Sequence, residues 1–143
     1  MIKDVTINQL KIIDLEEGRV FHALKKIDSG YKGFGEAYFS EIGPKKIKAW
    51  KRHKEMTLNL IVPIGQIRFI LFDDRNLKKQ KFQEVVLAKN SYKRLTIPPM
   101  IWFGFQGLSE STSLLLNIAD IVHDPAEVDR KHLDGIDFDW SSK

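Results

Sequence analysis

Turn-forming residues divide this chain at short, regular intervals, and this spacing constrains the fold more than any other feature of the sequence. The turns fall at residues 33–35, 43–44, 63–65, 73–76, 89–90, 98–99 and 107. Segments between such turns are long enough for strands and too short for most helices. Turn signals about every 8–12 residues are typical of an all-β sandwich or barrel.

The runs between these turns are rich in apolar, β-branched and aromatic residues. In 57–62, Leu58, Leu60 and Val62 alternate with the other three residues, as in a strand with one apolar face. Further strands are predicted at 35–42, 47–53, 66–72, 82–87, 93–97, 102–106 and 113–118, with a weaker one at 20–24.

Helix signals are scarce along the chain. Asp124 followed by Pro125 predicts a short helix or only a turn. The tail 137–140 is predicted to lie extended against the barrel. Many short strands with little helix predict a closed or two-sheet β fold, as one domain over residues 1–143.

The composition of the chain indicates the cellular compartment to expect. The chain has no cysteine, which excludes disulfides and thiolate nucleophiles. No apolar run has signal-peptide or membrane-span length. We therefore expect a cytoplasmic protein without a membrane partner.

The predicted strand 47–53 has an unusual concentration of cations. Strict alternation places Lys48, Trp50 and Arg52 on one face and Lys51 and His53 on the other. Such a strand either is an exposed edge or lines a polar cavity. The cavity is favoured, because cations beside an aromatic ring suit a nucleotide diphosphate.

Metal and cofactor motifs are missing. A histidine-based metal site needs paired ligands, and Lys51 occupies the position where a partner for His53 would lie. No phosphate-binding loop, dinucleotide fingerprint or nucleophile elbow is present. We predict no metal and no cofactor.

Several segments together resemble the dTDP-4-dehydrorhamnose 3,5-epimerase family of cupin-type barrels. Residues 35–42 and 47–54 are similar to the segment holding that family's Arg-Gly-Leu/Trp-His motif. Residues 95–105 resemble its Ile-Pro-Pro-Gly-x-Trp-His-Gly-Phe element, and 64–75 and 115–127 its next hairpin and its closing strand with the turn beyond. The resemblance implies a jelly-roll, a homodimer and a nucleotide-diphospho-4-keto-6-deoxysugar ligand in polysaccharide or lipopolysaccharide sugar biosynthesis.

The chain departs from the family at the residues that carry its chemistry. Known members move a proton beside the C4 ketone with a histidine base and a tyrosine acid. The base histidine falls on Lys51, the motif arginine on Lys48, and a second histidine on Phe103. The closing strand has Leu116 and Ile121 where tyrosines are expected.

We therefore predict Lys51 and His53 as catalytic, with Tyr38 and Tyr92 as the available phenols. The predicted substrate-binding residues are Tyr38, Lys48, Trp50, Arg52, Asn59, Arg68, Trp102 and Phe103.

Three functions remain open from sequence. The favoured one is a divergent sugar-nucleotide epimerase or isomerase. The second is a non-catalytic sugar-nucleotide-binding accessory protein, which would keep the cations and lose turnover. The third is a nucleic-acid-binding barrel, suggested by the net charge of +4 and pI near 9.2. It is disfavoured because the aromatics do not form a stacking platform over several strands, so we predict no nucleic-acid partner.

Overall fold

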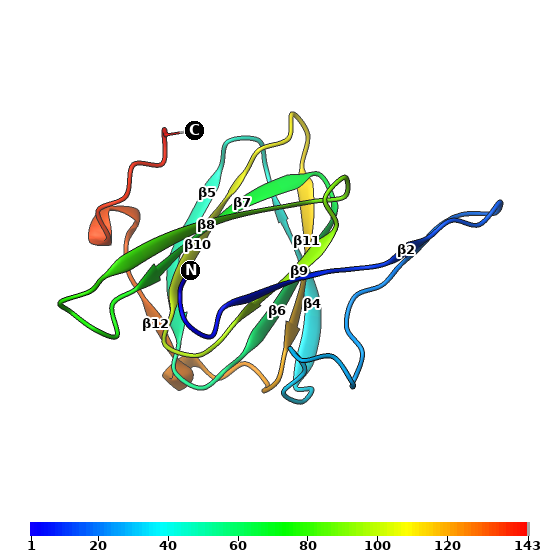
Figure 1. Ribbon diagram of the computed structural model, residues 1–143. Coiled ribbons are helices and arrows are strands. Elements are labelled where there is room, and N and C mark those ends of the chain that lie inside the picture. The colour runs from blue at the N-terminus through cyan, green and yellow to red at the C-terminus, as the bar shows by residue number, and fades with distance from the viewer. Residues whose placement is uncertain (143) are drawn as a thin grey trace.

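Two antiparallel five-stranded sheets form the body of the protein, as a computed structural model describes it for residues 1–142 (Figure 1). The first sheet has the order β1-β9-β6-β11-β4 and the second β12-β5-β10-β7-β8. The first comprises β1 (Thr6–Gln9), β9 (Lys93–Ile97), β6 (Leu58–Ile64), β11 (Ser113–Ala119) and β4 (Glu36–Ile42). The second comprises β12 (Val128–Arg130), β5 (Ile47–His53), β10 (Trp102–Gly107), β7 (Gln66–Asp73) and β8 (Lys81–Ala88). The predicted all-β, cupin-type jelly-roll is confirmed.

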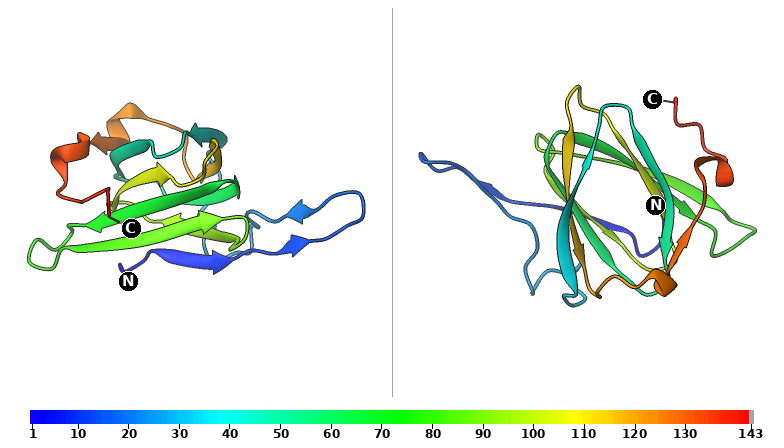
Figure 2. Two further views of the ribbon diagram at one scale, coloured as in Figure 1. Left: turned by 90° about the horizontal axis from the view of Figure 1, so that it is seen from above. Right: turned by 180° about the vertical axis from the view of Figure 1, so that it is seen from behind.

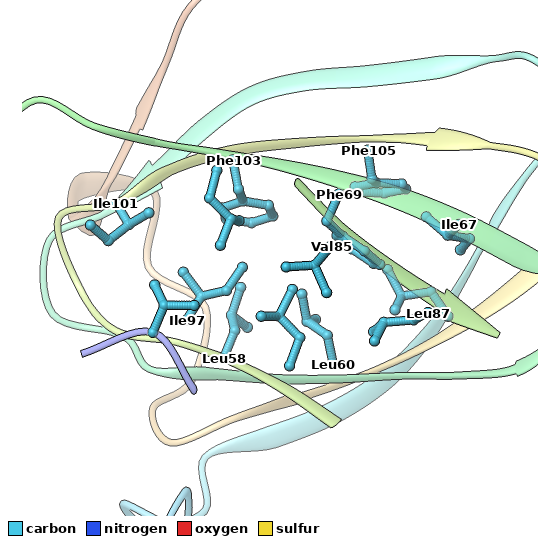
Figure 3. Packing of buried hydrophobic residues seen from close by; sticks show 14 of the residues in the cluster. Leu58, Leu60, Ile67, Phe69, Val85, Leu87, Ile97, Ile101, Phe103 and Phe105 are labelled. Atoms are coloured by element: carbon cyan, nitrogen blue, oxygen red, sulfur yellow. The ribbon is translucent and has the colours of Figure 1, made fainter. Parts of the chain in front are cut away.

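The main core lies between the two sheets. Figure 3 shows Leu58 and Leu60 of β6 facing Phe69 and Phe103 of the opposite sheet. Both leucines are essentially inaccessible to solvent. Each buried side chain of this size contributes about 1.5–3 kcal/mol, so the inward-facing rows hold the sheets together.

Local sequence signals place most strand boundaries within two residues. The predicted strands 47–53 and 93–97 coincide with β5 and β9. Gly65 closes the turn between β6 and β7 with a φ of 83°, a conformation that side chains with a Cβ rarely adopt.

Three short strands were not predicted, namely β1, β2 (Ile12–Ile13) and β12. β12 has only three residues, two of them charged, and it is assigned through its pairing with β5 rather than by an apolar pattern. The weak strand predicted at 20–24 is the two-residue β3 (Val20–Phe21). β2 and β3 form a ribbon that projects away from the sheets (Figures 1 and 2).

The C-terminal tail covers the outer face of the second sheet. Ile136 and Trp140 pack with Trp50, Ile70 and Phe72 in a second apolar cluster, as the prediction of a tail tucked against the barrel requires. Two 3-10 helices, η1 (Pro125–Glu127) and η2 (Leu133–Gly135), lie on the path to this tail. The side chain of Asp124 caps the first by accepting from the Ala126 amide. No helix among the described residues is long and apolar enough to cross a bilayer.

Candidate functional site

A cavity of about 370 Å³ opens between the two sheets at the β5 side of the barrel. Strands from both sheets contribute to its wall, so the cavity exists only when the sheets are packed together. Its lining residues are Tyr38, Ser40, Lys48, Ala49, Trp50, Lys51, Phe103, Phe105, Asn117, Arg130 and Lys131.

A register shift brings Lys48 and Lys51 into the same cavity. Along β10 the pairing with β5 runs from Phe103 opposite Lys51 to Phe105 opposite Lys48, so three steps on β5 match two on β10. The alternation of faces is therefore interrupted between these lysines. The prediction that Lys48 shares a face with Trp50 and Arg52 is wrong for this reason.

Trp50 is a lining residue of the cavity, but its ring packs against the C-terminal tail. Its indole Nε1 donates to the Leu133 carbonyl at 3.0 Å, and its ring packs at 5.2 Å from that of Trp140. The ring thus belongs to the cluster under the C-terminal tail, and the stacking surface inside the cavity comes from Phe103 and Phe105 instead.

Four cations line the cavity, namely Lys48, Lys51, Arg130 and Lys131, and the Lys131 Nζ lies 4.8 Å from the centre of the Trp102 ring. The Lys51 Nζ lies 5.7 Å from the centre of the Phe103 ring, and Arg130 faces Lys51 across the β5–β12 pairing. The Lys48 Nζ lies 6.0 Å from the Phe105 ring and donates to the Glu41 carbonyl at 3.0 Å. Within residues 1–142, no carboxylate side chain lines the cavity. Burial lowers the pKa of Lys51, the positive charges of Arg130 and Lys48 lower it further, and the nearby charge of Glu127 opposes this without reversing it.

Tyr38 and Asn117 contribute to the cavity from the first sheet. Burial raises the pKa of the Tyr38 phenol, the charge of Glu36 adds to this, and Arg130 opposes it. The Asn117 amide donates to the Ser40 hydroxyl at 3.0 Å, which fixes its orientation. The cavity therefore combines a lysine biased toward its neutral form with a phenol that keeps its proton at neutral pH.

His53 lies deeper, behind Phe103. Its ring stacks against Phe103 at 6.2 Å and its Nδ1 bonds to the Glu127 carboxylate. Glu127 also accepts from the amides of Glu55 at 3.1 Å and Met56 at 3.0 Å. Burial lowers the pKa of His53, although its bond to Glu127 opposes this. Burial would raise the pKa of Glu127, but its three hydrogen bonds outweigh that and lower it. The pair is therefore a neutral imidazole bonded to a carboxylate, and the Nε2 of His53 is buried without a partner in the described chain.

Four of the predicted substrate-binding residues lie outside this cavity. Arg52 stacks over Trp102 at 4.6 Å and pairs with Asp129 at 2.8 Å, on the outer face of β5 and β10. Asn59 donates to the Gly30 carbonyl at 2.8 Å, and Arg68 holds the tail through the Trp140 carbonyl at 2.8 Å. The fold itself therefore engages these side chains, although the Nε of Arg68 is buried without a partner among the described residues.

Of the predicted phenols, only Tyr38 reaches the cavity. Tyr92 lies on the first sheet's far side, where its hydroxyl donates to the His22 carbonyl at 2.7 Å. The structure thus brings together Tyr38, Lys48, Lys51 and Phe103, with His53 directly behind them.

The cavity includes residues that the sequence did not reveal. Arg130 lies on a strand too short for a periodic signal, and Asn117 lies inside an otherwise apolar run. Glu127 lies in the Asp-Pro-Ala-Glu segment, which the sequence marks as a possible helix start. No local pattern indicates that it bonds to His53, 74 positions away. No group of three or more histidines, aspartates and glutamates within residues 1–142 could hold a metal ion.

Known proteins provide an independent comparison. A dTDP sugar isomerase from Desulfovibrio desulfuricans G20 is 35% identical, with 99% of this chain and 93% of that chain covered and a TM-score of 0.93. The probable low-salt glycan biosynthesis epimerase Agl13 of Haloferax volcanii is 25% identical over 136 residues, covering 92% of this chain and 87% of its own length.

A more distant structure shares the fold. The dTDP-4-dehydrorhamnose 3,5-epimerase of Elizabethkingia anophelis has a TM-score of 0.79 at 16% identity, covering 99% of this chain and 83% of that one. A scan against models of protein families finds no match.

Proposed function

The chain belongs to the family of cupin-type dTDP-sugar isomerases and epimerases, and from this premise we propose that its cavity binds a nucleotide-diphospho-4-keto-6-deoxysugar and moves protons beside the ketone. The step serves the synthesis of a glycan, the process named for the Haloferax relative. The predicted epimerase-like function of the chain agrees with these relatives.

One observation carries the proposal, namely that Lys48, Lys51 and Arg130 meet in a cavity without a lining carboxylate. None of the ion pairs found among residues 1–142 involves these three cations, so their positive charge is available for a diphosphate. The Phe103 and Phe105 rings supply an apolar wall on which a sugar or a base can lie.

Proton removal beside a ketone places negative charge on the carbonyl oxygen. Cations already fixed at the site stabilise that charge without reorganising. Lys51 supplies an amine biased toward the neutral form, and Tyr38 supplies a phenol as proton donor from the other sheet. This pairing takes the place of the histidine and tyrosine that the family resemblance leads one to expect.

His53 and Glu127 form the support behind this centre. His53, which the sequence predicts as catalytic, stacks on Phe103, and Glu127 fixes its imidazole. We assign His53 as a positioning residue that holds the aromatic wall beside Lys51.

The test is hydrogen exchange followed by NMR. The protein is incubated in D2O with dTDP-4-keto-6-deoxyglucose, and the C3 and C5 proton signals are followed. Uptake of deuterium that Lys51→Ala abolishes and the exposed-loop control Lys78→Ala retains would support the proposal. Shifts of ligand signals without deuterium uptake would indicate the accessory binding protein instead. The absence of both shifts and uptake would refute the ligand class.

We also propose that the protein acts as a homodimer. The β2–β3 ribbon extends away from the sheets and leaves Leu15 and Val20 about half exposed, at 54% and 43% (Figure 2). A ribbon of this kind gains stability when it packs on another surface, because an isolated hairpin is marginal in water. Light scattering after size exclusion would detect a dimer, and Val20→Asp should weaken it, while a monomer at all concentrations would refute the idea.

A further inference from the structure

We propose that Lys51 acts covalently, by condensing with the ketone of the bound sugar to form an imine. The inference rests on the proposed function and specifies how the lysine would perform it. It assigns to Lys51 a reaction that the family's histidine could not perform, because an imidazole accepts a proton but does not condense to an imine.

The position of Lys51 meets the geometric requirement for a nucleophile. Its side chain enters the cavity from β5 and lies over the Phe103 ring. It makes no ion pair within the described residues, since the ion pairs of β5 involve Arg52, His53 and Lys54. The amine is therefore free to approach a carbonyl carbon.

The surroundings favour the neutral amine that the attack needs. Arg130 faces Lys51 across the strand pairing and Lys48 lines the same cavity, so an ammonium there is repelled by two like charges. Desolvation acts in the same direction. Lysines activated by burial and by a neighbouring cation are the ones that form Schiff bases with ketones.

The bonds balance without a further reagent. The Lys51 nitrogen bonds to the carbonyl carbon, and a proton moves from nitrogen to oxygen to give a carbinolamine. Tyr38 protonates the hydroxyl, which leaves as water and produces the iminium and a phenolate. The phenolate then removes the proton from the adjacent carbon, giving an enamine and regenerating the Tyr38 phenol.

The cations assist the second half of this sequence. An iminium carries the same charge as an ammonium, whereas the enamine is neutral, so Lys48 and Arg130 favour loss of the carbon-bound proton. Return of a proton to that carbon and addition of water restore the ketone and the free amine. The configuration of the product depends on the face to which the proton returns.

Reductive trapping tests the covalent step. The whole protein is incubated with dTDP-4-keto-6-deoxyglucose and cyanoborohydride, which reduces an iminium in preference to a ketone. We expect one ligand per chain by intact mass, and peptide mapping should place it on Lys51 and not on Lys48 or Lys131. Excess dTDP should prevent the adduct, which separates cavity chemistry from reaction with surface lysines.

Lys51→Arg keeps the positive charge and removes the amine that condenses. The adduct should fall at least tenfold in this variant and persist in Lys78→Arg, with the far-ultraviolet circular dichroism of both unchanged. Mapping of the wild-type adduct decides the question even if Lys51→Arg does not fold. Deuterium uptake at C3 or C5 with no adduct on Lys51 would overturn the imine and leave the proposed function standing. Absence of both would overturn both.

Discussion

Glu127 offers a direct test of how the buried support of the site is held. Its side chain is 5% exposed and accepts from the His53 ring and from the amides of Glu55 and Met56. Glu127→Ala leaves these donors without a protein acceptor, at about 1–3 kcal/mol for each group that stays buried. Because water can reach the more exposed Glu55 side, we expect a total loss of about 3–5 kcal/mol.

That loss is large against the total stability of a domain of this size, which is about 10 kcal/mol. It corresponds to a fall in Tm of about 10–17 °C. Glu127→Gln keeps the shape and one acceptor oxygen, so we expect a smaller loss of about 1–3 kcal/mol.

Urea unfolding followed by tryptophan fluorescence measures both variants. Trp50, Trp102 and Trp140 are all buried and report the opening of the second sheet and the tail. The exposed-turn variant Glu110→Ala is the matched control and should stay within about 0.5 kcal/mol of the parent. A loss below about 1 kcal/mol in Glu127→Ala, with an unchanged denaturant slope, would refute the reasoning about the buried donors.

Three further outcomes are expected. Burial lowers the pKa of His53, so the unfolded state binds more protons than the folded state near neutral pH. The free energy of unfolding should therefore decline as the pH falls below about 6.5. Urea titrations at pH 7, 6 and 5 should show this decline, and it should disappear in His53→Asn. Arg130→Gln removes one cause of the lowered Lys51 pKa. The rate of deuterium exchange, plotted against pH, should then rise at a higher pH than in the parent protein. An unchanged pH–rate profile would contradict the electrostatic role of Arg130. Arg68→Ala removes two hydrogen bonds to carbonyl groups of the tail, so the free energy of unfolding should fall by about 2–3 kcal/mol. Acrylamide should also quench the fluorescence of Trp140 faster. Unchanged quenching would show that the apolar contacts are enough to hold the tail.

Local sequence signals were sufficient for the fold class and for most strands. Turn residues and two-residue alternation act over a few positions, so they are readable without knowing the partner strand. The strands that escaped prediction, β1, β2 and β12, contain two to four residues and gain their definition from pairing. The strand rich in cations was also recognised correctly as part of the cavity wall.

The composition of the site was less accessible to sequence reasoning. Arg52 and Trp102 appeared suited to a nucleotide, but they are engaged with each other on the outer face. Asn59 and Arg68 were predicted to bind substrate, but they donate to backbone carbonyls of distant segments. Side chains of this kind are interchangeable in a sequence pattern, because only their partners distinguish a structural role from a binding role.

Residue order alone was enough to predict a closed or two-sheet β fold, the family resemblance, and a lysine where a histidine base was expected. These features depend on residue type and short-range order. Strand packing determines which cations share the cavity, because one register shift between β5 and β10 places Lys48 on the same side as Lys51. It also decided that Arg130 faces Lys51 and that Glu127 holds His53, since strand pairing brings together residues more than 70 positions apart. The physical reason is that alternation along one strand fixes faces only while its register with the neighbouring strand is unbroken.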